Sequence, residues 1–279
     1  MPNSAATPHR LPPQLLAVPR TVEPTRPLQW LARGWADLRR CPAVSLLHGV
    51  LMAVFGGLLL WLLDNRFWLM AGAFSGFLLV APILATGLYA LSRALEQGRP
   101  AGMGTVLHTW LNWQGGRIRP WGLMHGRLLR FGVLLAASGT SWVLTSAALI
   151  LLMAPAEIRT VDDFLRQVVL ADRGFLFELW VMLGGVLVAP IYASTVVTIP
   201  LLLDRQVRIR EAVLTSWLVV LANPGVMALW AGLILLLTLL GFALALVGTV
   251  VLVPLLGHAS WHAYRDLLDV SGLPAQEAV

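Results

Sequence analysis

The chain has 279 residues, of which 58% are hydrophobic and only 12% are charged. A soluble core of this size does not need so much apolar surface, so the composition excludes an ordinary water-soluble domain and predicts a membrane protein. The net charge of +6 is not gathered on a basic soluble module, which argues against nucleic-acid binding. A single cysteine, Cys41, excludes an internal disulfide.

Residues 1–27 contain seven prolines and show little periodicity, so we expect a disordered cytoplasmic tail. Beyond them, long runs contain no Asp, Glu, Lys or Arg. The longest, 212–264, has 53 residues and would form a helix about 80 Å long, whereas about 20 helical residues cross a bilayer. It therefore holds two spans, or one span and a surface helix. The other charge-free runs are 41–63, 67–92, 131–156 and 179–203.

The arginines indicate which loops face the cytoplasm, because cytoplasmic loops of inner-membrane proteins collect positive charge. Arginines precede the first run, fill the loop between the second and third, and recur at 204–211. The loop 155–177 mixes acidic and basic residues and is expected outside. A helix over about 160–170 is predicted there, because Thr160 and Asp163 have capping-box spacing and an apolar stripe follows. We place this helix on the outer leaflet; a lid or a partner-docking helix is the alternative.

An internal repeat fixes the number of spans. The string VLHTWL at 106–111 nearly matches VLTSWL at 213–218, and residues 31–35 are a weaker third copy. Apolar residues precede each tryptophan by three and four positions, which is one face of a helix. Short amphipathic helices with tryptophan at the edge lie in the membrane interface. The predicted interfacial anchors are therefore Trp35, Trp110 and Trp217.

Prolines mark the second half of each repeat. Small residues follow Pro82, Pro190 and Pro254 at similar offsets, and an arginine comes later in each case. We infer three units, about 28–93, 103–205 and 209–265, each with an interfacial helix, an outward span and a returning span. The predicted fold is an all-α bundle of six transmembrane helices over 28–268, with the last turn near Gly241–Gly248 and a short tail at 269–279. Chance similarity is the alternative to a repeat. The prolines are expected to kink spans, and a transport hinge is the alternative.

Three histidines are the candidate cofactor-binding residues. His258 and His262 lie one helical turn apart near the cytoplasmic end of the sixth span, and His48 lies at a comparable depth in the first. Ionisable residues within a membrane are costly and often functional. Three imidazoles could hold haem or a metal ion if these spans are neighbours. The alternatives are proton handling and a structural role in hydrogen bonds between helices; we expect no cofactor.

Charged residues also pair at the ends of the units: Arg93 with Glu96, Asp204 with Arg205, and Arg265 with Asp266. We interpret these pairs as local interface anchors, with binding of lipid headgroups as the alternative. No phosphate-binding glycine loop, nucleophile elbow or zinc motif occurs, so we expect no enzyme.

Three segments together resemble a known family: Gly34–Pro42 (GWADLRRCP), Ala81–Arg93 (APILATGLYALSR) and Leu255–Asp266 (LLGHASWHAYRD). They are similar to proteobacterial integral membrane proteins grouped only as a domain of unknown function, over roughly residues 28–270. The resemblance implies a bacterial inner-membrane location and no established activity. Some relatives carry the label of cytochrome c oxidase subunit I. This chain has half the spans of that subunit and lacks its membrane histidines, so the label implies at most an association with respiratory machinery.

The leading hypothesis is a non-enzymatic module of the bacterial inner membrane that binds, scaffolds or assembles other components, with both chain ends in the cytoplasm. Its partners would be the lipid bilayer and other inner-membrane proteins, with no nucleic acid. A second hypothesis is a carrier of a small or lipidic substrate through a central cavity gated at the three prolines. A third is a haem- or metal-binding accessory of respiratory machinery.

Overall fold

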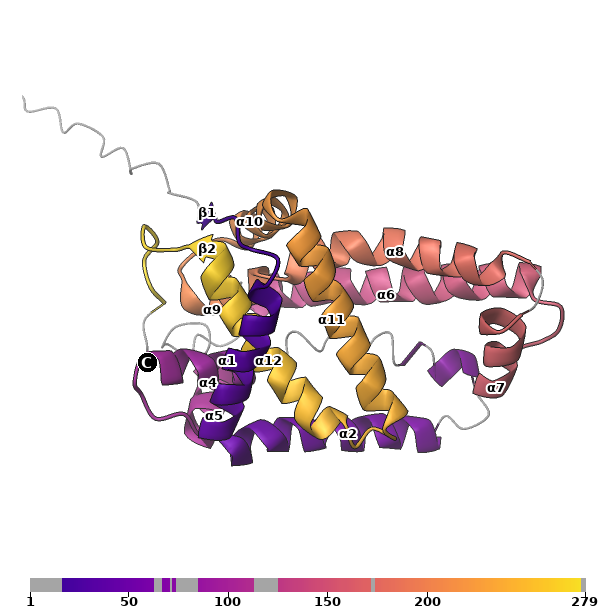
Figure 1. Cartoon of the computed structure of the whole chain (residues 1–279), viewed down its shortest axis with the longest axis horizontal. Coiled ribbons are helices and arrows are strands. Elements are labelled where there is room, and N and C mark those ends of the chain that lie inside the picture. Colours follow the sequence, from indigo (N-terminus) through magenta and orange to yellow (C-terminus); the bar gives the residue numbers. More distant parts are fainter. Residues whose placement is uncertain are drawn as a thin grey trace, which may run out of the picture.

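The computed structural model describes residues 17–62, 67–70, 72–73, 85–112, 125–171 and 174–276, and it is mostly helical, as predicted (Figure 1). Two short strands, β1 (Val18–Pro19) and β2 (Leu268–Asp269), accompany the helices. The helices of the first half are α1 (Arg26–Arg40), α2 (Pro42–Leu62), α4 (Thr86–Glu96), α5 (Met103–Asn112), α6 (His125–Met153) and α7 (Val161–Phe164). The π-helix η1 (Leu165–Val169) and the helices α8 (Leu176–Thr195), α9 (Thr198–Asp204), α10 (Ile209–Ala222), α11 (Pro224–Ala243) and α12 (Thr249–Leu267) follow.

Three helical segments of the described chain are long and apolar enough to cross a membrane: Pro42–Leu62, Leu176–Asp204 and Pro224–Ala243. Helices α2, α6 and α8 run along the long axis of the molecule, with α6 beside α8, whereas α1 runs across that axis at one end (Figure 1). An amphipathic helix that lies across the direction of α2 and α8, two of the three candidate spans, suits the membrane interface. The number of six spans stays a prediction.

Two of the junctions between a short helix and a long helix are built alike. Cys41 ends α1 with φ −133° and ψ 59°, and Asn223 ends α10 with φ −133° and ψ 48°. In both places a proline follows and begins the next helix, at Pro42 and Pro224. A proline disfavours helical geometry at the residue before it and suits the first turn of a helix, so each junction is a sharp corner set by the sequence.

Helix α12 is the centre of the bundle, with α1, α2 and α4 packed directly on it. Its Trp261 and Tyr264 are fully buried, as are Trp30 of α1 and Trp230 of α11. Glycines permit the close approach: a Cβ atom on Gly34 would lie 2.7 Å from the backbone nitrogen of Ala259. Small residues let helix backbones approach closely in this way.

The prediction of a disordered tail over residues 1–27 does not hold for residues 17–27. Val18–Pro19 pairs antiparallel with Leu268–Asp269, and α1 begins at Arg26. Proline is compatible with an edge strand, where the missing N–H is not needed, so a proline-rich segment need not be disordered. Residues 1–16 lie outside the described part. The predicted tail at 269–279 also packs on the bundle as far as Gln276, because Ala275 forms a β-bridge with Arg205.

Two finer predictions are confirmed. The helix expected in the loop 155–177 forms over α7 and η1, and Thr160 caps it through the capping box with Asp163. The last turn lies at 244–248, between α11 and α12, with positive φ angles at Ala245 and Leu246. Phe164 and Val168 form the apolar side of this helix. They pack in a cluster with side chains from other parts of the chain: Ile150, Ile158, Leu176, Phe67, Trp68 and Trp180.

Candidate functional site

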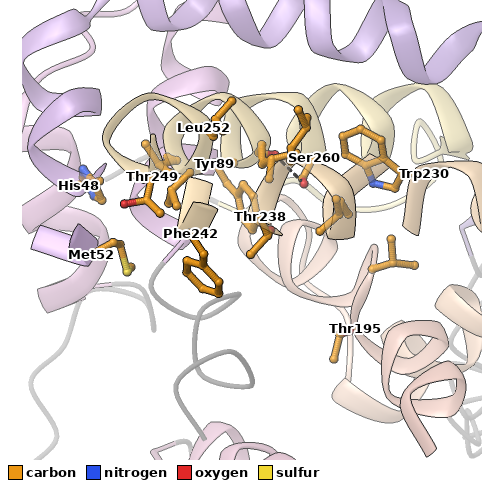
Figure 2. A pocket seen from close by; sticks show the side chains of 18 of the residues that line it. His48, Met52, Tyr89, Thr195, Trp230, Thr238, Phe242, Thr249, Leu252 and Ser260 are labelled. Atoms are coloured by element: carbon orange, nitrogen blue, oxygen red, sulfur yellow. Dashed lines mark hydrogen bonds between the residues drawn. The ribbon is translucent and has the colours of Figure 1, made fainter. Parts of the chain in front are cut away.

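A cavity of about 280 Å³ lies among helices α2, α4, α8, α11 and α12 (Figure 2). Each of these helices contributes to its wall, for example through Met52, Tyr89, Thr195, Phe242 and Leu252. The carrier hypothesis required a central cavity, and the structure contains one. Small-molecule sites are concave, mostly apolar and often lie between the helices of a bundle.

Most hydroxyl groups of the cavity wall have hydrogen-bond partners within the protein. Thr195 donates to the carbonyl of Ile191 at 2.8 Å, and Ser260 donates to the carbonyl of Leu256 at 2.7 Å. Tyr192 donates to the carbonyl oxygen of Met227 at 3.0 Å. Hydrogen bonds to backbone carbonyls satisfy these side chains, so the wall offers mainly hydrocarbon. A cavity lined in this way has little to hold water and favours an apolar occupant.

His48 borders the cavity, but its free nitrogen is covered by helix α4. Its Nδ1 lies 2.8 Å from the carbonyl oxygen of Val44, which can only accept, so Nδ1 carries the proton. Its Nε2 is buried with no hydrogen-bond partner among the described residues. Gly87 covers that atom: a Cβ there would lie 2.6 Å from Nε2. This nitrogen is therefore shielded from any ligand that enters the cavity.

His258 is the centre of a buried polar network. Its Nδ1 lies 2.7 Å from Ser92 Oγ, and its Nε2 lies 2.9 Å from Ser45 Oγ. Ser92 donates its own proton to Asp37 Oδ2 at 2.8 Å, so it accepts from the Nδ1–H of His258. Nε2 is then the acceptor of the imidazole, and the Ser45 hydroxyl donates to it. Ser45 has the distance of an activated nucleophile, but it is completely buried and no substrate reaches it.

His262 enters the same network through Asp37, whose Oδ2 lies 2.8 Å from His262 Nε2. Burial alone would raise the pKa of Asp37, but hydrogen bonds from His262 and Ser92 favour the carboxylate, so the pKa is lowered. The network thus joins α1, α2 and α4 to α12. None of the buried side-chain polar atoms of this network lacks a partner within the described residues, which is the condition under which such a network stabilises a fold.

The structure therefore brings two of the three predicted histidines into one network and leaves the third apart. Within the described ranges, no group of three or more His, Cys, Asp or Glu side chains is arranged to hold a metal ion. The residues that sequence reasoning missed are Asp37, Ser45 and Ser92. They lie on three different helices, and no local pattern in the sequence links them to His258.

The predicted interfacial tryptophans are all partly exposed, and two of them dock in the same way. Trp110 Nε1 donates to Thr86 Oγ1 at 3.3 Å, and Trp217 Nε1 donates to Ser194 Oγ at 3.0 Å. Each acceptor stands four positions after its proline, Pro82 or Pro190. The same position after Pro254 is His258, which meets Ser45 and Ser92 instead of an indole.

The three short helices also follow one packing rule. Helix α5 packs on α4, α10 packs on α8, and α1 packs on α12. Each interfacial helix thus lies against the returning helix of another predicted unit. Of the hinge candidates, Pro190 lies inside α8 and Pro254 inside α12, whereas Pro82 lies outside the described residues.

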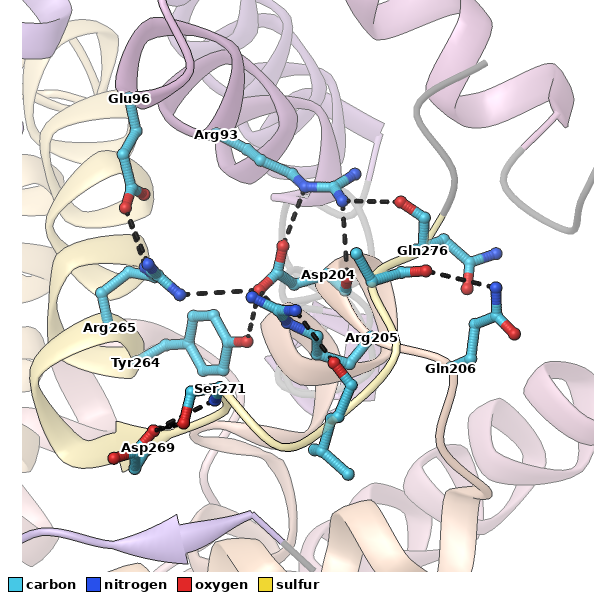
Figure 3. A network of polar contacts seen from close by, with 12 residues as sticks. Arg93, Glu96, Asp204, Arg205, Gln206, Tyr264, Arg265, Asp269, Ser271 and Gln276 are labelled. Atoms are coloured by element: carbon cyan, nitrogen blue, oxygen red, sulfur yellow. Dashed lines mark hydrogen bonds and ion pairs between the residues drawn. The ribbon is translucent and has the colours of Figure 1, made fainter. Parts of the chain in front are cut away.

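The ends of the three predicted units meet at Asp204 (Figure 3). Its carboxylate lies 2.9 Å from Arg93 Nε and 3.0 Å from Arg205 Nε, and it accepts from the Tyr264 hydroxyl at 2.8 Å. Arg265 lies 3.7 Å away. Of the three pairs expected from sequence, only Asp204 with Arg205 is present. Arg265 pairs with Glu96 at 2.9 Å, and Asp266 pairs with Arg33 and Arg26.

Two of the expected pairs are wrong because the returning helices lie side by side. Neighbours in space then compete with neighbours in sequence for each charge. A buried carboxylate also needs several donors, which one adjacent arginine cannot supply.

Comparison with known proteins gives one match. No curated protein and no solved structure matches the chain significantly. Residues 69–204, just under half of the chain, match the sequence model of a family described as "Predicted integral membrane protein (DUF2189)". This segment runs from the first predicted unit to Asp204 in the ion-pair cluster. Through residues 69–204 the chain is therefore similar to DUF2189, a family of predicted integral membrane proteins of unknown function.

Proposed function

We propose that this integral membrane protein is a non-enzymatic binding module that holds a small apolar or lipidic molecule within the bundle. The cavity of about 280 Å³ carries the proposal, because apolar side chains form most of its wall and the hydroxyl groups of Thr195 and Ser260 bond to backbone carbonyls. An engineered apolar cavity of about 150 Å³ binds benzene. A cavity of nearly twice that volume suits two fused rings or part of an acyl or isoprenoid chain.

Photo-crosslinking tests this function. The protein is reconstituted in nanodiscs with a fatty alcohol that carries a diazirine on its chain, and the adducts are mapped by mass spectrometry. We expect adducts at wall residues such as Met52 and Leu252. Adducts confined to outward-facing residues such as Leu51, which is 54% exposed, would contradict the proposal.

Two neighbouring glycines of α2 provide a matched pair of variants. Gly56 is buried in the cavity wall, so Gly56→Leu should fill the cavity and remove the adducts inside it. A Cβ on Gly57 meets nothing within 4 Å, so Gly57→Leu should leave those adducts unchanged. Equal losses in both variants would indicate a general effect on the helix rather than occupancy of the cavity.

A carrier is the second candidate, and the position of two prolines favours it. Pro190 and Pro254 interrupt the hydrogen bonding of α8 and α12, which both form cavity wall. A kink beside a binding site can open it to one side of the membrane. Pro190→Ala and Pro254→Ala should then keep the cavity adducts but slow the exchange of a preloaded probe between nanodiscs. Unchanged exchange rates would contradict the carrier and support the binding module.

The proposed setting is the bacterial inner membrane, with six spans in three units and both chain ends in the cytoplasm. The matching corners at Cys41 and Asn223, the matching tryptophan contacts and the shared cluster at Asp204 support three units. The pairing of β1 with β2 puts both ends of the described chain on one face, where arginines gather. Fusions of green fluorescent protein and of alkaline phosphatase after Gln276 test this orientation. We expect the first fusion to be fluorescent; an active phosphatase would show that this end lies on the opposite side of the membrane.

A further inference from the structure

The face of the bundle where the three predicted units end carries more positive charge than its own carboxylates can neutralise. Almost every acidic side chain of this face has a basic partner within 4.0 Å. These carboxylates are Asp37, Glu96, Asp204, Glu211, Asp266 and Asp269; Glu23 is the exception. The charged residues at the unit ends, which could have bound lipid headgroups, are therefore already paired within the protein.

Three exposed arginines of this face have no carboxylate partner in the described part of the chain: Arg39, Arg99 and Arg210. Arg39 lies in the last turn of α1, Arg99 precedes α5, and Arg210 lies in the first turn of α10. Arg39 and Arg210 therefore belong to α1 and α10, and Arg99 lies in the connection that leads into α5. Guanidinium groups bind phosphate oxygens through two parallel hydrogen bonds. None of the three is held by a carboxylate of the described chain, although Arg99 donates one hydrogen bond to Gln97 Oε1.

Exposed apolar side chains lie beside each of these arginines. On α1, Arg39 is one turn beyond Trp35, which is 42% exposed. On α10, Arg210 is one turn before Leu214, which is 60% exposed. Met103, Leu107 and Trp110 form the same kind of exposed stripe on α5, after Arg99. An apolar stripe with a cation at its end matches a phospholipid, whose acyl chain and phosphate are adjacent.

We propose that Arg39, Arg99 and Arg210 are binding positions for anionic phospholipids, one at each interfacial helix. The phosphate would bind the guanidinium, and the acyl chain would lie along the exposed tryptophan and leucine side chains. The surplus of arginines on this face favours an anionic lipid over a neutral one, because these arginines require a negatively charged partner at the depth of the headgroups. This inference goes beyond the cavity and does not depend on its occupant.

Native mass spectrometry tests the proposal on protein released from nanodiscs of equal parts phosphatidylglycerol and phosphatidylcholine. The variant Arg39→Gln/Arg210→Gln removes two unpaired cations. The control Arg159→Gln/Arg166→Gln removes two cations from the outer loop, where they pair with Glu157 and Asp162. Both variants lower the formal net charge equally, so they differ in where the charge is lost and in whether the removed arginine has a carboxylate partner.

We expect the wild-type protein to retain phosphatidylglycerol in preference to phosphatidylcholine. That preference should fall about fivefold for each arginine removed at the proposed positions and stay unchanged in the control. An equal fall in both variants would overturn the proposal, because total charge would explain it. The proposal would also be overturned if the protein retained an acidic protein instead of lipid, or if inorganic phosphate displaced the bound lipid. Equal melting temperatures of the variants show that both are folded.

Discussion

At the end of the bundle where α1, α4, α9 and α12 meet, Asp37 and Asp204 are almost fully buried. Helices α7 and η1 lie at the other end (Figure 1), and their Asp162 and Arg166 are exposed. The buried carboxylates each accept from several donors on different helices. The exposed pairs, Arg159 with Glu157 and Arg166 with Asp162, join residues only two and four positions apart.

This difference separates two uses of charge in one membrane protein. Pairs that are buried and span several helices hold the bundle together, and the loss of one member leaves the others desolvated and unpaired. Exposed local pairs lose little on separation, because water replaces the partner. The end formed by α7 and η1 relies instead on an aromatic cluster that includes Phe164 and Trp180. Substitutions at the two ends should therefore have very different effects.

The largest effect is expected for Asp204→Ala. The substitution leaves Arg93 buried without its carboxylate and removes the acceptor of the Tyr264 hydroxyl. Breaking a buried ion pair from one side costs about 3–5 kcal/mol, so the melting temperature in detergent should fall sharply. Glu157→Ala removes an exposed carboxylate at the other end and is the control. A small loss for Asp204→Ala, similar to that of the control, would mean that the cluster is solvated.

The next effect concerns Asp37, and pH reveals it. Because hydrogen bonds lower the pKa of Asp37 in the folded protein, its carboxylate contributes stability above its unfolded pKa of about 3.8, and this is lost as the pH falls through the folded value. Asp37→Asn should lower the melting temperature near neutral pH by removing a charged acceptor worth about 1.5–3 kcal/mol. The gap to the wild type should narrow below about pH 4. A gap that is constant with pH would contradict a role for the ionised carboxylate.

These two networks also mark the limit of prediction from sequence. Helix positions followed from charge-free runs, and the outer-loop cap followed from Thr160 and Asp163, because both depend on residues close in the chain. The partners of Asp37 and Asp204 depend on which helices are neighbours in space. Ser92 and His258 are 166 positions apart, and no spacing rule connects them. The cavity likewise required the relative placement of five helices.

The candidate site was therefore only partly predictable. The histidines were identified because ionisable side chains are rare in apolar runs, but their roles were not. His48 is set apart by a hydrogen bond within its own helix and by the contact with Gly87. Two of the three charge pairs predicted at the unit ends differ in the structure, because Glu96 and Asp266 pair with arginines of other helices and not with their sequence neighbours. In contrast, the tryptophan anchors are exposed as expected, since amphipathic periodicity is a local property.

A smaller effect is expected for Gly87→Ala, at the contact between α4 and His48. The new methyl group would lie 2.6 Å from His48 Nε2 and 3.1 Å from Val106 Cγ1, so the imidazole must move. Overpacking of this kind costs about 1–3 kcal/mol. Gly102→Ala is the matched control, because its Cβ would meet nothing within 4 Å. Thermal unfolding of both variants measures the difference, and equal stability would show that His48 has room to turn.

The smallest effect is expected at the outer end, for Arg166→Ala. The ion pair between Arg166 and Asp162 spans one turn and is 2.8 Å long, yet both side chains are mostly exposed. Such pairs contribute about 0.3–0.5 kcal/mol, and added salt screens them. The melting temperature should therefore change little, and less still in high salt. A large loss would mean that Arg166 contacts something beyond this chain, and the outer helix would then be a docking surface rather than a membrane-surface helix.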